Sequence, residues 1–247
     1  MNNGKIKTHL VIGANGGIAT SVIKRLLDSS GDDRVVCISR SPDSPFLASH
    51  NARVEWIQSD NSEHSMETVS DLMQQQSLRF DRVFICNGIL HGAEIFPEKQ
   101  LQDVNANALV TLFTVNAIQP VLWLKHLIRL LPKDKQCVVT VFSARVGSIA
   151  DNQLGGWYGY RASKAAQNML LKTAAIECRR FAKNIKFLAF HPGTTDTHLS
   201  APFQKGLPAA KLFRPEFVAE KLLNLIENLP DEPALNFLDW DGKAVAW

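Results

Sequence analysis

Short runs of apolar residues alternate with longer amphipathic stretches along most of the chain. Each run has four to six residues, and several lack the polar alternation of a strand with one solvated face. Such runs are typical of strands covered on both faces, as in a parallel sheet. The seven predicted strands are His9–Ile12, Val35–Ser39, Val54–Gln58, Val83–Cys86, Cys137–Phe142, Ile185–Phe190 and Leu235–Leu238.

Amphipathic patterns of helical period separate these runs. The predicted helices are Ile18–Leu27, Met66–Met73, Leu109–Leu131, Ala165–Phe181 and Phe217–Leu229. Strands that alternate with helices favour βαβ units and a parallel sheet with right-handed crossovers. We therefore expect an α/β fold: a single doubly wound Rossmann domain over residues 1–247, with a parallel seven-stranded sheet and helices on both faces.

The segment 194–214 departs from this rhythm. It contains Pro202, Gly206 and Pro208 and has no sustained periodicity. At about twenty residues it is longer than a usual connection, which indicates either a substrate lid or a poorly ordered loop.

The composition excludes several classes of function. Lys plus Arg is 27 and Asp plus Glu is 24, so no nucleic-acid partner is expected. No stretch approaches 18 uninterrupted apolar residues, so no membrane span is expected, and the first apolar run is too short for a signal-peptide core. Four cysteines without a Cys-x-x-Cys pair indicate reduced thiols in a cytoplasmic protein. The seven histidines form no metal-binding pattern, so no metal is expected.

A glycine-rich turn follows the first predicted strand. It reads Gly13-Ala14-Asn15-Gly16-Gly17-Ile18-Ala19 and leads into a helix. Such a turn lets the backbone approach a pyrophosphate, which then lies at the helix N-terminus. The alternative is a plain connection between a strand and a helix. The predicted phosphate contacts are Gly13, Asn15, Gly16, Gly17 and Ile18.

The end of the second predicted strand indicates which dinucleotide would bind. Ser39-Arg40 stands where an NAD-binding fold places an acid for the ribose 2′-hydroxyl. An arginine suits a 2′-phosphate instead, because its guanidinium matches phosphate geometry. We therefore predict NADP(H), with Ser39 and Arg40 as contacts. The alternatives are a solvated loop arginine and an NAD-linked enzyme.

Tyr160 and Lys164 are four residues apart in a predicted helical region. Residues at this spacing share one face of a helix, so the phenol and the ammonium point the same way. A nearby ammonium favours the phenolate and is expected to lower the phenol pKa towards neutrality. Tyr160 could then act as a general acid or base. The alternative is a pair on the helix surface.

Further motifs lie in a fixed order along the chain. Asn87-Gly88 follows the fourth strand, Asn116 lies inside a helix, and Pro192-Gly193 with Thr197 follows the sixth strand. Together with the glycine turn and Tyr160/Lys164, they resemble the short-chain dehydrogenase/reductase family over nearly the full length. The stretches Ser143–Ile149, Gly155–Arg161 and Asp241–Trp247 look most like sniffer-type carbonyl reductases and bacterial C-factor proteins.

The resemblance implies roles for the matching residues. Tyr160 would protonate the carbonyl oxygen, and Lys164 would hold the ribose hydroxyls and tune the phenol. Asp60 would bind the adenine amine, and the Pro192-Gly193 turn would offer backbone groups to the carboxamide. For Asp60 and Thr197 local capping is the alternative. The implied cofactor contacts are Asp60, Asn61, Asn87, Gly88, Tyr160, Lys164, Pro192, Gly193, Thr195 and Thr197.

Asn116 is a candidate for a proton relay. Pro120 lies four residues later and has no N–H, so the Asn116 carbonyl lacks its ordinary helical bond. That carbonyl is free to hold the water that the family's relay to the lysine uses. A proline kink that serves packing alone is the alternative.

The serine of the family pattern is absent at its usual place. The fifth strand of the family usually ends Ser-Ser-x-x-Gly, and its second serine polarises the carbonyl. Here Ala144 stands at that place between Ser143 and Gly147. We expect Ser143 to replace it, with Ser148 as the alternative. Loss of such a donor costs about 3 kcal/mol of transition-state stabilisation, so efficiency is affected more than reaction type.

These motifs together predict an NADP(H)-dependent carbonyl reductase or alcohol dehydrogenase. Hydride would pass between the nicotinamide and a ketone, aldehyde or quinone, with Asn116, Ser143, Tyr160 and Lys164 as the catalytic set. The alternative is an NADP(H)-binding regulatory or cell-signalling protein with little or no turnover. The family resemblance also implies a homodimer or homotetramer.

Overall fold

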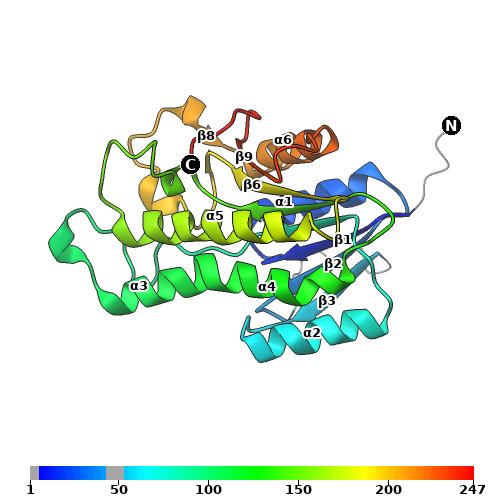
Figure 1. Ribbon diagram of the computed structural model, residues 1–247. Coiled ribbons are helices and arrows are strands. Elements are labelled where there is room, and N and C mark those ends of the chain that lie inside the picture. The colour runs from blue at the N-terminus through cyan, green and yellow to red at the C-terminus, as the bar shows by residue number, and fades with distance from the viewer. Residues whose placement is uncertain (1–5, 43–52) are drawn as a thin grey trace.

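The computed structural model describes residues 6–42 and 53–247 of the chain (Figure 1). Residues 1–5 and 43–52 of the expected domain lie outside the described residues. All candidate site residues belong to the described part of the chain.

A parallel sheet of seven strands forms the centre of the molecule. Its order is β3-β2-β1-β4-β5-β6-β9, and every neighbouring pair is parallel. All seven predicted strands are present, with ends that differ by at most one residue. Their bounds are β1 Thr8–Ile12, β2 Arg34–Ser39, β3 Val54–Gln58, β4 Arg82–Ile85, β5 Cys137–Phe142, β6 Ile185–His191 and β9 Leu235–Asp239.

Helices cover both faces of this sheet. Helices α1 and α6 pack together on one face, and α2, α4 and α5 lie on the other (Figure 1). Each helical layer packs a separate cluster of buried apolar side chains against its face of the sheet, so the doubly wound Rossmann fold is confirmed. The helices are α1 Gly17–Ser29, α2 Glu63–Gln75, α3 Ala106–Phe113, α4 Gln119–Leu127, α5 Tyr158–Cys178 and α6 Pro215–Glu227.

The strand order reverses at β1. From β1 the chain builds outward through β2 and β3, then crosses to β4 and continues through β5 and β6 in the other direction. The connections that leave β1 and β4 therefore diverge and open a crevice at the carboxyl ends of these strands. Ligands of open α/β sheets bind at such a point.

Two helices differ from their predicted form. The predicted helix Leu109–Leu131 is interrupted by a π-helical turn, η3, at Thr114–Ile118, between α3 and α4. Helix α5 begins at Tyr158, seven residues before the predicted start, so Tyr160 and Lys164 belong to its first turns.

The segment 194–214 has local order. Its ends, β7 Thr194–Thr195 and β8 Leu212–Phe213, pair in parallel, and two short 3-10 turns, η6 Ala201–Phe203 and η7 Ala209–Lys211, lie between them. The segment thus leaves the sheet and returns to nearly the same place, over the carboxyl edge of the strands.

One run of helix among the described residues, Ala106–Leu130, is long and apolar enough to cross a membrane by length and composition. This is weak evidence for a membrane, because core helices of soluble proteins pass the same test. Here the run is broken by the π-helical turn and packs against α2 and α5.

Candidate active site

The glycine-rich turn connects β1 to α1 at the crevice. Gly13 has a φ of +77°, which favours glycine, and its N–H donates to the Ile38 carbonyl. Gly16 is the N-cap of α1, and no described side chain caps this helix end. A Cβ on Gly17 would lie 2.9 Å from Cγ2 of Thr197, so a side chain there would collide with segment 194–214. The turn thus leaves the N–H groups of α1 free for an anion.

A cavity of about 560 Å³ lies at this edge of the sheet. Its volume suits a cofactor or a drug-sized ligand. The structure brings together at its wall these predicted residues: Gly13, Asn15, Gly16, Gly17, Ile18, Ser39, Arg40, Asp60, Asn61, Asn87, Gly88, Ser143, Tyr160, Lys164, Pro192 and Thr197. Asn116, Gly193 and Thr195 do not line it.

Other residues at the wall were missed by the sequence reasoning. Most of them come from loops and helix faces, where no motif marks them. Three could have been inferred, because Ala19 ends the glycine-rich motif and Cys86 and Phe142 stand at strand ends. The additional lining residues are Ala19, Ser41, Cys86, Ile89, His91, Val115, Gln119, Phe142, His198 and Leu199.

Tyr160 and Lys164 lie buried side by side on α5. The Lys164 Nζ is 6.0 Å from the centroid of the Tyr160 ring. It donates to the Phe142 carbonyl at 2.9 Å and to Oε1 of Gln167 at 3.0 Å. Burial lowers the pKa of Lys164 to about 7.

Burial also raises the pKa of Tyr160 above its ordinary value. The expectation that Lys164 lowers this pKa is therefore wrong. The physical reason is that desolvation acts on both groups and makes either charge costly. Burial thus holds the phenol protonated, beside an amine whose pKa lies near neutrality.

Asn116 lies in the π-helical turn, and its side chain is fully hydrogen-bonded. Its Oδ1 accepts from the Ile89 N–H at 2.8 Å, and its Nδ2 donates to the Ile89 carbonyl at 2.9 Å and to Ser163 Oγ at 3.0 Å. Ser163 in turn donates to the Tyr160 carbonyl. Asn116 thus ties the loop after β4 to the first turns of α5. The role of its carbonyl stays a prediction.

The two candidate serines have different surroundings. Ser143, at the end of β5, lines the cavity, and its hydroxyl donates to Oδ1 of Asn168 at 2.6 Å. Ser148 is 2% exposed and does not line the cavity, and its Oγ accepts from the Asp151 N–H. Ala144 packs in an apolar cluster with Tyr160. The role of Ser143 stays a prediction, and a hydrogen bond to a ligand in the cavity would require its hydroxyl to turn away from Asn168.

Residues at the ends of β2 and β3 form the far part of the cavity. Arg40 is exposed and makes no ion pair with a described carboxylate. Asp60 is also exposed, and a hydrogen bond from Ser62 lowers the pKa of its carboxyl. Asn61 adopts a φ of 62°, and its Oδ1 accepts from Nδ2 of Asn87 and from the Trp123 indole. The local cap at Asp60 still leaves this carboxylate at the cavity wall.

The start of α5 is anchored by a residue that the sequence analysis did not single out. Glu98 is 4% exposed, and its carboxylate accepts from the Gly159 N–H. A Cβ on Gly159 would lie 2.6 Å from Leu112 Cδ1 and 2.9 Å from this carboxylate, so a larger residue there would displace both side chains. An acidic group at a helix N-terminus is favourable, and this one fixes the turn that carries Tyr160.

Aromatic rings continue the wall away from Tyr160. Trp157 lies 6.2 Å from the Tyr160 ring and 5.1 Å from Phe203, and His91 lies 5.8 Å from Phe203. His91 also hydrogen-bonds the His198 carbonyl. The loops after β4 and before α5 therefore meet segment 194–214 through apolar and aromatic contacts.

The fold and the cavity together define a Rossmann-type protein with a crevice at the carboxyl ends of its strands and a buried tyrosine–lysine pair on the wall of that crevice. Residues 7–207 match the family of short chain dehydrogenases. The chain belongs to this family, and the resemblance inferred from its motifs is confirmed.

Two curated relatives illustrate the range of the family. The chain is 29% identical to 1-hydroxy-2-glutathionyl-2-methyl-3-butene dehydrogenase of a Rhodococcus species, over 98% of this chain and 100% of the relative. It is 32% identical to the C-signal protein of Myxococcus xanthus, over 60% of this chain and 83% of the relative.

Solved structures share the fold. The carbonyl reductase Sniffer of D. melanogaster superposes with a TM-score of 0.84 at 19% identity, over 98% of this chain and 100% of its own. The NADPH-bound carbonyl reductase from chicken fatty liver gives a TM-score of 0.83 at 21% identity, over 99% and 100%.

Proposed function

We propose that the protein is an NADP(H)-dependent oxidoreductase. It transfers hydride between the nicotinamide and a ketone, aldehyde or quinone, or the corresponding alcohol, with Tyr160 as general acid and base. The observation that carries the proposal is the joint position of the phosphate turn, Arg40 and the buried Tyr160/Lys164 pair on the wall of one cavity.

The residues at the wall fit the cofactor. The N-terminus of α1 offers uncapped N–H groups to the pyrophosphate, and Arg40 offers a guanidinium without a described carboxylate partner to a 2′-phosphate. The Oδ1 of Asn87 is buried and has no partner among the described residues, so it is available to a ligand donor. The relative from chicken fatty liver holds NADPH in the same fold.

Nicotinamide, when bound, supplies or accepts the hydride. The chain's own groups manage the proton and the geometry. In the reducing direction Tyr160 gives its phenolic proton to the carbonyl oxygen, while the Lys164 ammonium stabilises the phenolate that remains. Ser143 donates a hydrogen bond to the same oxygen, and Asn116 holds the first turns of α5 in register with the loop after β4.

The substrate side of the cavity favours an apolar carbonyl compound. Ile89, His91 and Leu199 line it, and the rings of Trp157 and Phe203 stand behind. The segment 194–214 closes over this side as a lid, held through the His91–His198 contact. Two relatives, from Bacillus cereus and Bacillus subtilis, are named benzil reductases.

The test compares NADPH oxidation with a panel of aldehydes, ketones and quinones for wild type, Tyr160→Phe and Tyr158→Phe. Tyr158 is the matched control, because it lies two residues away but is exposed. We expect Tyr160→Phe to lose about 10²–10⁴-fold in kcat while NADPH binding persists, with Tyr158→Phe close to wild type. Equal turnover in all three proteins would refute the role of Tyr160. Tight NADPH binding without any turnover would instead favour the regulatory function.

A further inference from the structure

Gln167 is a buried amide next to the catalytic lysine. It lies three residues after Lys164 on α5 and is 2% exposed. Its Oε1 accepts a hydrogen bond from the Lys164 Nζ at 3.0 Å, and the Phe142 carbonyl accepts a second at 2.9 Å. A lysine ammonium has three donors. Two are thus fixed by α5 and the end of β5, and the third is left for the cavity that Lys164 lines.

The other surroundings of Gln167 are apolar. Its Nε2 is buried and has no partner among the described residues. The side chain borders a small cavity of about 10 Å³ between α4 and α5, large enough for about one water molecule. The remaining lining residues of this cavity are Ala117, Pro120, Val121, Leu124, Val141, Leu170 and Leu171.

A glutamine in such a place is costly unless its polar atoms are used. A buried polar group without a partner costs about 1–3 kcal/mol, and an aliphatic side chain of similar size would avoid this cost. The contact with Lys164 is the one hydrogen bond that the described residues provide for this amide. The contact with the lysine is therefore the physical reason for an amide at this position.

We propose that Gln167 is a positioning residue for the reaction: its side-chain oxygen holds the Nζ of Lys164 between α5 and β5, so that the remaining N–H points to the cofactor cavity. The inference rests on the proposed function for the role of Lys164 in turnover. The contact itself does not depend on a cofactor or a substrate.

The same contact favours the charged form of the lysine. An amide oxygen stabilises an ammonium and works against the burial that lowers the pKa of Lys164. Loss of the oxygen should therefore lower this pKa further, and a carboxylate in its place should raise it.

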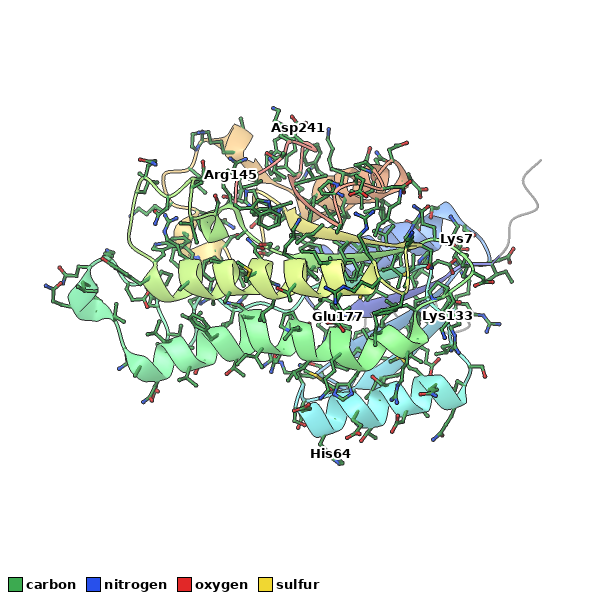
Figure 2. The ribbon with its side chains drawn as sticks, in the orientation of Figure 1. Lys7, His64, Lys133, Arg145, Glu177 and Asp241 are labelled. Carbon is green, nitrogen blue, oxygen red and sulfur yellow. The ribbon has the colours of Figure 1, made fainter. Side chains whose placement is uncertain are left out.

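Few other charges face Lys164 from the elements packed against it. Tyr160 lies one turn earlier on α5. Arg145 of the 3-10 turn η5 (Arg145–Gly147), seen above α5 in Figure 2, pairs with Asp239 at 2.9 Å and lies 3.7 Å from Asp151. The imidazole of His191, at the end of β6, is held neutral, because burial lowers its pKa to about 4.

The remaining charged groups on these elements lie away from Lys164. On α4, Lys125 is exposed and pairs with Glu63, and His126 lies 3.9 Å from the same carboxylate. On β6, Lys186 pairs with Asp231. The η3 turn and α3 carry no charged residue.

The test uses Gln167→Met, Gln167→Glu and the control Leu170→Met. Methionine keeps about the length of the side chain but removes the amide oxygen that accepts from Lys164, whereas glutamate replaces the amide with a carboxylate. Leu170 lines the same small cavity and makes no polar contact there, so its variant reports packing alone. The Nζ of Lys164 is titrated by ¹⁵N NMR in protein without cofactor, and its signal is assigned by its loss in Lys164→Met.

We expect the Lys164 midpoint to fall by about one pH unit in Gln167→Met and to rise in Gln167→Glu, with Leu170→Met unchanged. Unchanged midpoints in both Gln167 variants would overturn the proposal, as would equal shifts in Gln167→Met and Leu170→Met. If either Gln167 variant does not fold, the other still decides, because each has its own predicted direction.

A second readout is the pH profile of NADPH-dependent reduction. The alkaline limb, where Lys164 loses its proton, should move in the same two directions as the NMR midpoint. A profile that moves with the NMR midpoint supports the proposal. If the Lys164 midpoint shifts in the Gln167 variants but the protein shows no turnover, the proposed function is rejected while the contact between Gln167 and Lys164 is supported. Turnover with immobile midpoints would reject this inference alone.

Discussion

Replacing Arg40 with alanine should weaken NADPH binding and spare NADH. Arg40 is exposed at the end of β2 and lines the cavity, so its charge acts through a water-like dielectric. In that medium two unit charges about 4 Å apart interact by about 1 kcal/mol. A 2′-phosphate carries close to two charges, which gives about 2 kcal/mol, or about a 30-fold change in the dissociation constant.

Binding is measured by the fluorescence of NADPH and of NADH with wild type, Arg40→Ala and Arg34→Ala. Arg34 is the matched control, since it is an exposed arginine at the opposite end of the same strand. The NADPH effect should shrink as salt rises, because the Debye length is only about 8 Å at physiological ionic strength. Equal weakening of both cofactors, or the same loss in Arg34→Ala, would refute the assignment of Arg40 to the 2′-phosphate.

Two further predictions concern the serines and the opposite end of the sheet. Ser143→Ala should lower kcat/KM by up to about 10²-fold, because the Ser143 hydroxyl must leave Asn168 to reach the substrate. Ser148→Ala should have little effect on kcat/KM, and a larger loss in Ser148→Ala than in Ser143→Ala would assign the hydrogen-bond donor to Ser148. Burial lowers the pKa of His9 to about 4, so the folded protein favours the neutral imidazole. The contribution of this imidazole to stability is complete above about pH 6.5 and is lost as the pH falls to about 4. Urea unfolding at pH 7 and pH 4 should show wild type losing about 3 kcal/mol more than His9→Gln, and parallel losses would contradict this.

The sheet and its helical layers could be predicted because burial on both faces leaves a signal in each strand. The strand β5, for example, is buried at all six positions and reads as an unbroken apolar run apart from Thr140. The glycine turn, Arg40 and the Tyr160/Lys164 spacing are equally local signals, so these residues of the cavity wall could be proposed from sequence alone.

What could not be predicted depends on partners that are distant in sequence. Helix α5 starts at Tyr158 because the Glu98 carboxylate, 61 residues before Gly159, accepts its N–H. Gln167 and Asn168 look like an ordinary polar helix face, yet they are buried against Lys164 and Ser143. The rise in the Tyr160 pKa has the same origin, since burial by remote segments outweighs a charge four residues away.

The π-helical turn at Thr114–Ile118 accommodates one extra residue without changing how the helix packs. Each residue of a regular helix adds about 100° of rotation, and a π turn holds one residue more than an α turn. Because the wider turn takes up this residue within one revolution, α3 and α4 stay nearly in phase and keep their packing against α5 and α2. Deleting one residue there would restore a regular helix with these packing faces in place. The same deletion would displace the Asn116 side chain from Ile89 and Ser163, so the fold should tolerate it and the candidate site should not.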